Sequence, residues 1–172
     1  MTPVLETERL ILREWRLEDF DGFSAFWADP DRTAHFISGT VDASTAWSMF
    51  CAMLGEWRLR GLGSFAVQEK TGSVLGYTGL WFPLDIEEPE LLWSLYAGSE
   101  GKGFAIEAAR RVQQWAAFDL KLPPLMSYVH PDNLKSQAVA KRLGATVEAE
   151  TTLRGHPRLV FRHIHPENTL QS

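Results

Sequence analysis

The chain has 172 residues, 45% of them hydrophobic, so it is long enough to bury its own core, and one domain spanning residues 1–172 is expected. Its formal charge of −5 disfavours nucleic acid and anionic membranes as partners, because both attract clustered lysine and arginine. The single cysteine, Cys51, excludes an internal disulfide. With neither a signal peptide nor a membrane span in the sequence, we expect a soluble protein of the cytoplasm.

The spacing of apolar residues predicts an alternation of helices and strands. The first half is expected to form a strand at 9–13, a helix at 17–29, a helix from Asp42 or Ser44 to Arg60, and strands at 64–68 and 74–81. The second half is expected to form a strand at 91–96, a helix at 105–118, a strand at 125–129, a helix from Asn133 to Leu143, strands at 146–153 and 159–162, and a frayed tail at 166–172. Cys51 is expected to lie on the inward face of its helix. Hairpins combined with a crossover predict an α+β domain with helices on both faces of a mixed sheet.

A glycine-rich loop at residues 99–105 lies between a predicted strand and a predicted helix. Gly101 and Gly103 leave backbone amides uncovered at the start of that helix, where unpaired N–H groups and the helix dipole favour an anion such as a phosphate group. The spacing completes neither the dinucleotide fingerprint nor a P-loop. A turn that uses glycine only for its geometry is therefore the alternative interpretation.

Several segments occur together in an order that resembles one family of enzymes. They are Thr7–Arg13, Glu90–Leu95 leading into Gly101–Ala108, and His130–Ser136 followed by Ala140–Ala145. Across residues 7 to about 163 they are similar to the GNAT superfamily of acyl-CoA-dependent N-acyltransferases, and most of all to its RimJ/RimL-like branch. The resemblance implies the GNAT fold, with a mixed, mostly antiparallel sheet of about seven strands and helices on both faces. It also implies a V-shaped opening between the strands at 91–96 and 125–129.

The same resemblance implies how acetyl-CoA, the co-substrate, would bind. Backbone amides of the glycine loop would hold its pyrophosphate, the strand before the loop would pair with its pantetheine arm, and a later helix would contact the arm and the sulfur. The residues concerned are Gly101, Lys102, Gly103, Phe104 and Ala105 in the loop, Leu95, Tyr96 and Ala97 in the strand, and Asn133 and Ser136 in the helix. Glu100 departs from the family, which has Gln or Arg there, and we expect its carboxylate to turn away from the pyrophosphate.

Transfer of an acetyl group to an amine needs one group beside the leaving thiolate and another that takes the proton of the amine. The branch has a serine corresponding to Ser136, and residues 138–140 offer no tyrosine, so Ser136 is the predicted partner of the thiolate. Glu90 is the leading candidate for the base. The other acidic candidates are Glu87, Glu88 and Glu150. An ordinary helix cap at Asn133 and a solvated acidic loop around Glu90 are the alternatives.

The sequence therefore predicts direct transfer of an acetyl group from acetyl-CoA to a primary amine, in a ternary complex and without a metal ion. The acceptor, a protein N-terminus or a small molecule, is not specified, since one fold serves many acceptors. Trp57, Trp81 and Tyr128 are candidates to line its pocket, although seven tryptophans also suit a core or a homodimer interface. A CoA-binding sensor or assembly subunit without catalysis is the alternative function, because Glu100 and the missing tyrosine depart from the family.

Overall fold

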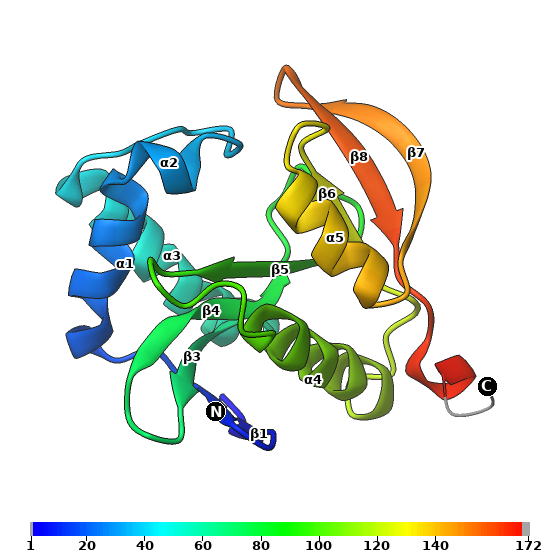
Figure 1. Ribbon diagram of the computed structural model, residues 1–172, viewed down its shortest axis with the longest axis horizontal. Coiled ribbons are helices and arrows are strands. Elements are labelled where there is room, and N and C mark those ends of the chain that lie inside the picture. The colour runs from blue at the N-terminus through cyan, green and yellow to red at the C-terminus, as the bar shows by residue number, and fades with distance from the viewer. Residues whose placement is uncertain (1, 170–172) are drawn as a thin grey trace.

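One sheet of eight strands organises the part of the chain that the structure describes, residues 2–169 of a computed structural model (Figure 1). Its strands are β1 Leu5–Glu6, β2 Leu10–Arg13, β3 Ser64–Glu69, β4 Val74–Trp81, β5 Glu90–Leu95, β6 Met126–Val129, β7 Thr146–Leu153 and β8 His156–Arg162. In space they follow the order β1-β2-β3-β4-β5-β6-β8-β7, and every neighbouring pair is antiparallel except β5 with β6. The predicted mixed, mostly antiparallel sheet is confirmed.

Helices cover both faces of this sheet, as predicted. They are α1 Phe20–Ala28, α2 Pro30–Thr33, α3 Ala43–Arg60, α4 Phe104–Phe118 and α5 Leu134–Arg142, with 3-10 turns at Leu17–Asp19 and Pro166–Thr169. Successive side chains of β3 point to opposite faces of the sheet and enter two different cores. Phe65 packs against the buried side of α4, in what is called the α4 core below, and Ala66 packs on the other face with α1 and α3. A smaller core joins α5 to β6 and β8 through Ala140, Val129 and Phe161. Figure 1 shows α4 and α5 lying side by side, away from α1 and α3.

The long helices begin and end where the sequence offers capping residues. Asp42 accepts a hydrogen bond from the amide of Thr45 at 2.7 Å, so it is the cap of α3, and Ser44 is not. Gly61 ends the same helix with a φ of 71°, a left-handed conformation that glycine adopts without strain. Local chemistry therefore sets the limits of α3, and its buried side chains set which face meets the sheet.

Two elements and the position of one residue differ from the sequence predictions. Strand β1 has 2 residues, too few for periodicity to reveal. Pro30 was expected only to end α1, but it also begins α2, because proline suits the first turn of a helix. Cys51 is exposed rather than buried. The buried side of α3 consists of Ala46, Phe50 and Met53.

The predicted frayed tail is also wrong in part. Pro166–Thr169 form a 3-10 turn beside α4, and residues 170–172 lie outside the described residues. None of the helices within residues 2–169 has the length and apolar character needed to cross a membrane.

Candidate active site

The sheet opens between β5 and β6. Their register contains one pair, Glu90 with Met126, after which the two strands diverge, as Figure 1 shows. The hydroxyl of Ser127 donates a 2.6 Å hydrogen bond to the carbonyl of Leu91 and ties the strands together beside that pair. Beyond it, β6 pairs with β8 and leaves the edge of β5 uncovered. The expected V-shaped opening is therefore present, and Glu90 lies at its closed end.

The backbone of β5 presents alternate residues to this opening. The amide of Tyr96 donates to the carbonyl of Leu75 at 2.7 Å, so Tyr96 faces β4. Because successive residues of a strand face opposite neighbours, Trp93 and Leu95 direct their backbone groups into the opening, where an amide-containing chain could pair with them. Tyr96 is thus a correction to the predicted contacts. Trp93, two residues before Leu95, has the same backbone direction and was not among the predicted contacts.

The glycine loop has the geometry of an anion site. Gly101 and Gly103 have φ angles of 75° and 81°, and Gly98, just before the loop, has a φ of 81°, a region that other residues rarely adopt. Gly103 immediately precedes α4, so the amides of Phe104 and Ala105 belong to the first turn and have no acceptor within the helix. These N–H groups and the positive end of the helix dipole both favour a pyrophosphate.

A set of contacts from Thr7 and Arg9, in the turn between β1 and β2, holds this loop in place. Arg9 donates from Nη1 to the carbonyl of Lys102 at 3.0 Å and from Nε to Glu107 at 2.7 Å, and its guanidinium lies 4.5 Å from the centre of the Phe104 ring. Thr7 donates to Glu107 at 2.6 Å. The start of α4 is therefore fixed to the sheet. No local pattern in residues 7–13 indicates this role, because Thr7 and Arg9 reach Glu107 across 100 and 98 residues of the chain.

The carboxylate of Glu100 is neutralised by a neighbouring charge. It forms an ion pair with Arg32 of α2, which also lies 3.8 Å from Asp29. The structure supplies a charged partner for the Glu100 carboxylate, and the expected direction of this side chain relative to a bound pyrophosphate stays a prediction. An ion pair removes most of the repulsion that an isolated carboxylate would exert on an anion.

Glu90 has the environment of a base that works near neutral pH. Burial raises its pKa to about 7, although the Tyr128 amide, which donates to its Oε1 at 3.1 Å, acts in the opposite direction. The positive charges of Arg158 and Arg154 also lower the pKa, by a smaller amount. A carboxyl group with such a pKa is partly ionised at neutral pH and holds a proton well. The alternative of a freely solvated Glu90 is therefore disfavoured.

The other acidic candidates lie in different surroundings. Arg162 donates to both oxygens of Glu88, at 2.6 and 3.0 Å, and these bonds hold the pKa of Glu88 below its ordinary value. Glu87 and Glu150 lie nearer to solvent than Glu90 does. A carboxylate that is already paired, or well hydrated, is a weaker proton acceptor than a buried one.

Asn133 and Ser136 meet at the start of α5. The Oδ1 of Asn133 accepts a hydrogen bond from the amide of Ser136 at 3.0 Å, so Asn133 is the helix cap that the alternative interpretation expected. The cap uses only Oδ1 and leaves the side-chain NH₂ group for other partners. The side chain of Ser136 is half-buried in the first turn of the helix.

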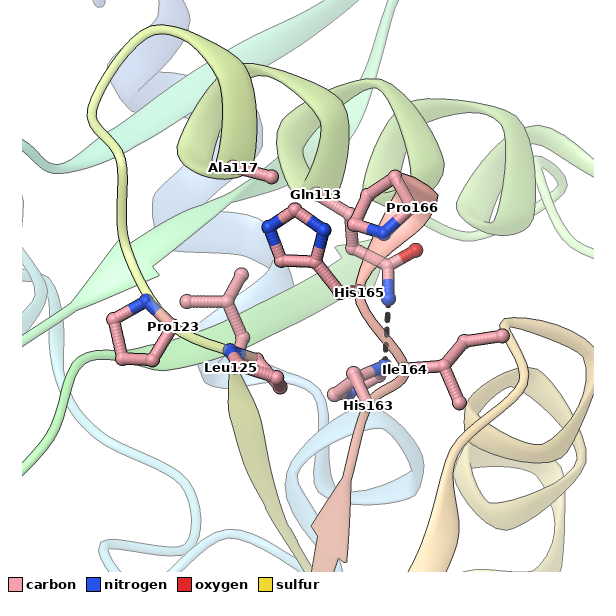
Figure 2. Close-up of a pocket in the computed structure, with 9 residues that line it drawn as sticks. Gln113, Ala117, Pro123, Leu125, His163, Ile164, His165 and Pro166 are labelled. Carbon is pink, nitrogen blue, oxygen red and sulfur yellow. Dashed lines mark hydrogen bonds between the residues drawn. The ribbon is translucent and has the colours of Figure 1, made fainter. Parts of the chain in front are cut away.

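A buried polar network holds the closed end of the opening. Because the Ser127 hydroxyl donates to Leu91, its oxygen accepts from Nε2 of His163 at 2.9 Å, and Nδ1 of His163 then accepts from Gln113 at 2.8 Å. Figure 2 shows the bond between Gln113 and His163 beside a cavity of about 10 Å³, which has room for little more than one water. Burial lowers the pKa of His163 to about 4, so the ring is neutral.

The aromatic residues predicted to line an acceptor pocket occupy different places. Trp57 lies in the α4 core, 4.9 Å from Phe65 between ring centres, and its indole donates to Ser64, so that prediction is wrong. Trp81 packs, partly buried, against the core of α1 and α3. Tyr128 is half-buried, and its amide donates to Glu90 at the opening. Tyr128 is therefore the member of this group that lies against a candidate catalytic residue.

Comparison with known families is consistent with this geometry. Residues 9–146 match the family described as acetyltransferase (GNAT) domain. The chain belongs to the GNAT acetyltransferase family. It is accordingly an acyl-CoA-dependent N-acyltransferase, and the resemblance read from Thr7–Arg13 and Gly101–Ala108 is confirmed.

Individual GNAT proteins resemble the chain over nearly its whole length. An acetyltransferase structure from Agrobacterium tumefaciens is 38% identical, with a TM-score of 0.86, and 94% of each chain is covered. The uncharacterized N-acetyltransferase p20 of Bacillus licheniformis is 32% identical over 165 residues, 93% of this chain and 90% of the relative. RimL, a ribosomal alpha-N-protein acetyltransferase solved with coenzyme A, has a TM-score of 0.77 with 94% and 98% coverage. At 14% identity this last likeness concerns the fold alone.

Proposed function

We propose that this GNAT protein transfers the acetyl group of acetyl-CoA directly to a primary amine within a ternary complex. The observation that carries the proposal is the opening between β5 and β6, which joins an uncovered strand edge to a glycine loop and ends at an acid with a pKa of about 7. Acetyl-CoA would supply a thioester whose carbonyl carbon the amine attacks and whose thiolate leaves.

The residues of the chain suit the different parts of acetyl-CoA. The amides of residues 101–105 would hold the pyrophosphate, with Arg32 keeping the Glu100 carboxylate paired. The backbone of Trp93 and Leu95 would pair with the amide groups of the pantetheine arm. The NH₂ group of Asn133 would donate to a carbonyl of the same arm.

Two side chains would carry the proton chemistry. Glu90 would accept the proton of the attacking amine, through water or directly, because burial gives its carboxylate a raised proton affinity. Ser136 would donate a hydrogen bond to the departing sulfur. Its hydroxyl keeps its proton at neutral pH, so it would stabilise the thiolate without full proton transfer.

The proposal is tested by incubating the protein with acetyl-CoA and a panel of amines: peptides with free N-termini, amino acids and polyamines. Release of free thiol is followed, and the amine is weighed by mass spectrometry. We expect thiol release that depends on the amine and an acceptor that gains one acetyl group. Binding of acetyl-CoA by calorimetry without turnover on any amine would support the CoA-binding sensor, and absence of binding would contradict both functions.

A further inference from the structure

The β7–β8 hairpin carries three arginines, and they differ in whether a carboxylate pairs with them. Arg154 donates to both oxygens of Asp85, at 2.6 and 2.7 Å. Arg162 donates to both oxygens of Glu88. Arg158 lies between them in the chain and forms no ion pair within 4.0 Å with any carboxylate of residues 2–169. The outer pairs fasten the hairpin to the β4–β5 loop, whereas the middle arginine has no acidic partner there.

Arg158 is also one of the most buried charges of the molecule. Its exposed fraction is 6%, similar to the 5% of Arg13, but Arg13 donates two hydrogen bonds to Asp19 at 2.8 and 2.9 Å. The hydrogen bonds from the Arg158 guanidinium go to backbone carbonyls, those of Pro157 at 2.8 Å and His35 at 3.2 Å. Burial lowers the pKa of Arg158. A buried charge without a paired carboxylate costs several kcal/mol, and within residues 2–169 the Arg158 guanidinium has, among carboxylates, only the longer-range attraction of Glu90 to offset that cost.

The position of Arg158 connects it to the opening. Leu159 pairs with Val129, the last residue of β6, so Arg158 lies level with the chain that continues into His130. The carbonyl that accepts from Arg158 belongs to His35, whose ring lies 5.2 Å from that of His130. Glu90 interacts with the guanidinium at longer range than an ion pair. Arg158 thus borders the region between the loop after α2, the end of β6 and the candidate base.

We propose that Arg158 binds a carboxylate of the amine acceptor, so that the acceptor is an amino acid or a peptide with an acidic group close to its free amine. This inference rests on the proposed function, since it assigns the acceptor of the same site. A planar guanidinium matches a carboxylate through two parallel hydrogen bonds. The single positive charge of Arg158 balances one carboxylate, whereas a phosphate dianion would bring a second, unbalanced negative charge into the region that also holds Glu90.

Matched acceptors test the inference, each pair differing in one acidic group. The pairs are L-phenylalanine with phenethylamine, L-leucine with isoamylamine, a tripeptide beginning Ala-Asp with one beginning Ala-Asn, and O-phosphoethanolamine with ethanolamine. We expect a higher kcat/KM for the carboxylate-bearing member of at least one pair, through a lower KM. The amino acid and peptide pairs separate the two sources of carboxylate. A preference for phosphoethanolamine alone would overturn the assignment of a carboxylate.

Variants of two arginines show whether the preference depends on Arg158. In Arg158→Met the ratio of kcat/KM within the preferred pair should fall by about 100-fold, the size of a lost charge-assisted contact. Arg158→Lys keeps the positive charge but loses the planar group that donates two parallel hydrogen bonds. Its ratio of kcat/KM should therefore lie between those of the wild type and Arg158→Met. Arg154→Met is the matched control, because it removes a hairpin arginine that Asp85 already satisfies, and its ratio should equal that of the wild type. A ratio that survives Arg158→Met, or that falls equally in the control, would overturn the inference.

Calorimetry separates this inference from the proposed function. Binding of each pair to the protein with CoA is measured in the wild type and in Arg158→Met, without any need for turnover. A carboxylate preference in binding that disappears in the variant supports Arg158 even if no acetylation occurs. Acetylation of amines without any carboxylate preference would refute the inference and leave the proposed function in place. A protein that neither binds nor acetylates a carboxylate-bearing amine would contradict the inference outright.

Discussion

Glu90 combines a buried carboxyl group with a position at the closed end of the opening, so its ionisation should appear in the kinetics. We expect kcat/KM of the wild type to rise with pH through an apparent pKa near 7, because the ionised form accepts the proton of the amine. Glu90→Gln should lower kcat/KM by about 100-fold at neutral pH and remove this rise. Glu87→Gln, a change at a neighbour nearer to solvent, should leave the profile intact. An unaltered pH profile in Glu90→Gln would assign the base elsewhere.

Ser136 lies in the first turn of α5 and is proposed to act on the leaving sulfur only after the thioester has been attacked. Ser136→Ala should therefore lower kcat about tenfold while the affinity for acetyl-CoA, measured by calorimetry, stays within about twofold. Alanine is a good helix former, so α5 should remain folded, as circular dichroism can verify. Equal kcat values for the two proteins would remove the proposed role.

The pairing between α2 and the glycine loop has consequences for acetyl-CoA affinity. Arg32→Met leaves the Glu100 carboxylate without its partner beside the pyrophosphate site, and we expect acetyl-CoA to bind about fivefold more weakly, a small effect because both side chains are partly hydrated. The double variant Arg32→Met with Glu100→Gln should recover the affinity of the wild type. Calorimetry on the single and double variants provides the test. A double variant as weak as Arg32→Met would show that Arg32 acts by another route.

Elements with strong local signals were predictable from the sequence. Helix α3 has a cap at Asp42 and a glycine stop at Gly61, and the loop before α4 has glycines at the positions that need a left-handed backbone. Strand β1 and helix α2 were not predictable, because each is too short for periodicity, and Pro30 serves equally well as a stop and as a first-turn residue.

Contacts within the site were harder to predict, because they join distant parts of the chain. Glu107 lies 98 residues from Arg9, and no local pattern indicates that they meet at the glycine loop. The partner of Glu100 belongs to α2, an element that was itself missed. The direction of the Tyr96 amide depends on the register of β5 with β4, which a run of apolar residues leaves undetermined.

The hydrogen-bond network of Ser127, His163 and Gln113, at the closed end of the opening, couples the stability of the whole molecule to pH. The folded state holds the pKa of His163 at about 4, below its ordinary 6.5, so the unfolded chain binds the extra proton first. The contribution of the neutral His163 ring to the free energy of unfolding is present in full above pH 6.5. It is lost as the pH falls to about 4, and this loss lowers the free energy of unfolding by about 3 kcal/mol at most.

Denaturant unfolding between these pH values tests that coupling. We expect the free energy of unfolding of the wild type to fall more steeply with decreasing pH than that of His163→Gln, which has no titrating ring. His165→Gln is the control, since the His165 ring is less buried. Parallel curves for the wild type and His163→Gln would show that the ring does not stay neutral in the folded protein.

Direct transfer within a ternary complex is the central claim, and initial rates test it most directly. Rates of thiol release are measured while acetyl-CoA and the best amine of the panel are varied together. We predict double-reciprocal lines that intersect, with thiol release that requires the amine. Parallel lines, together with an acetyl group found on the protein by mass spectrometry, would contradict the account.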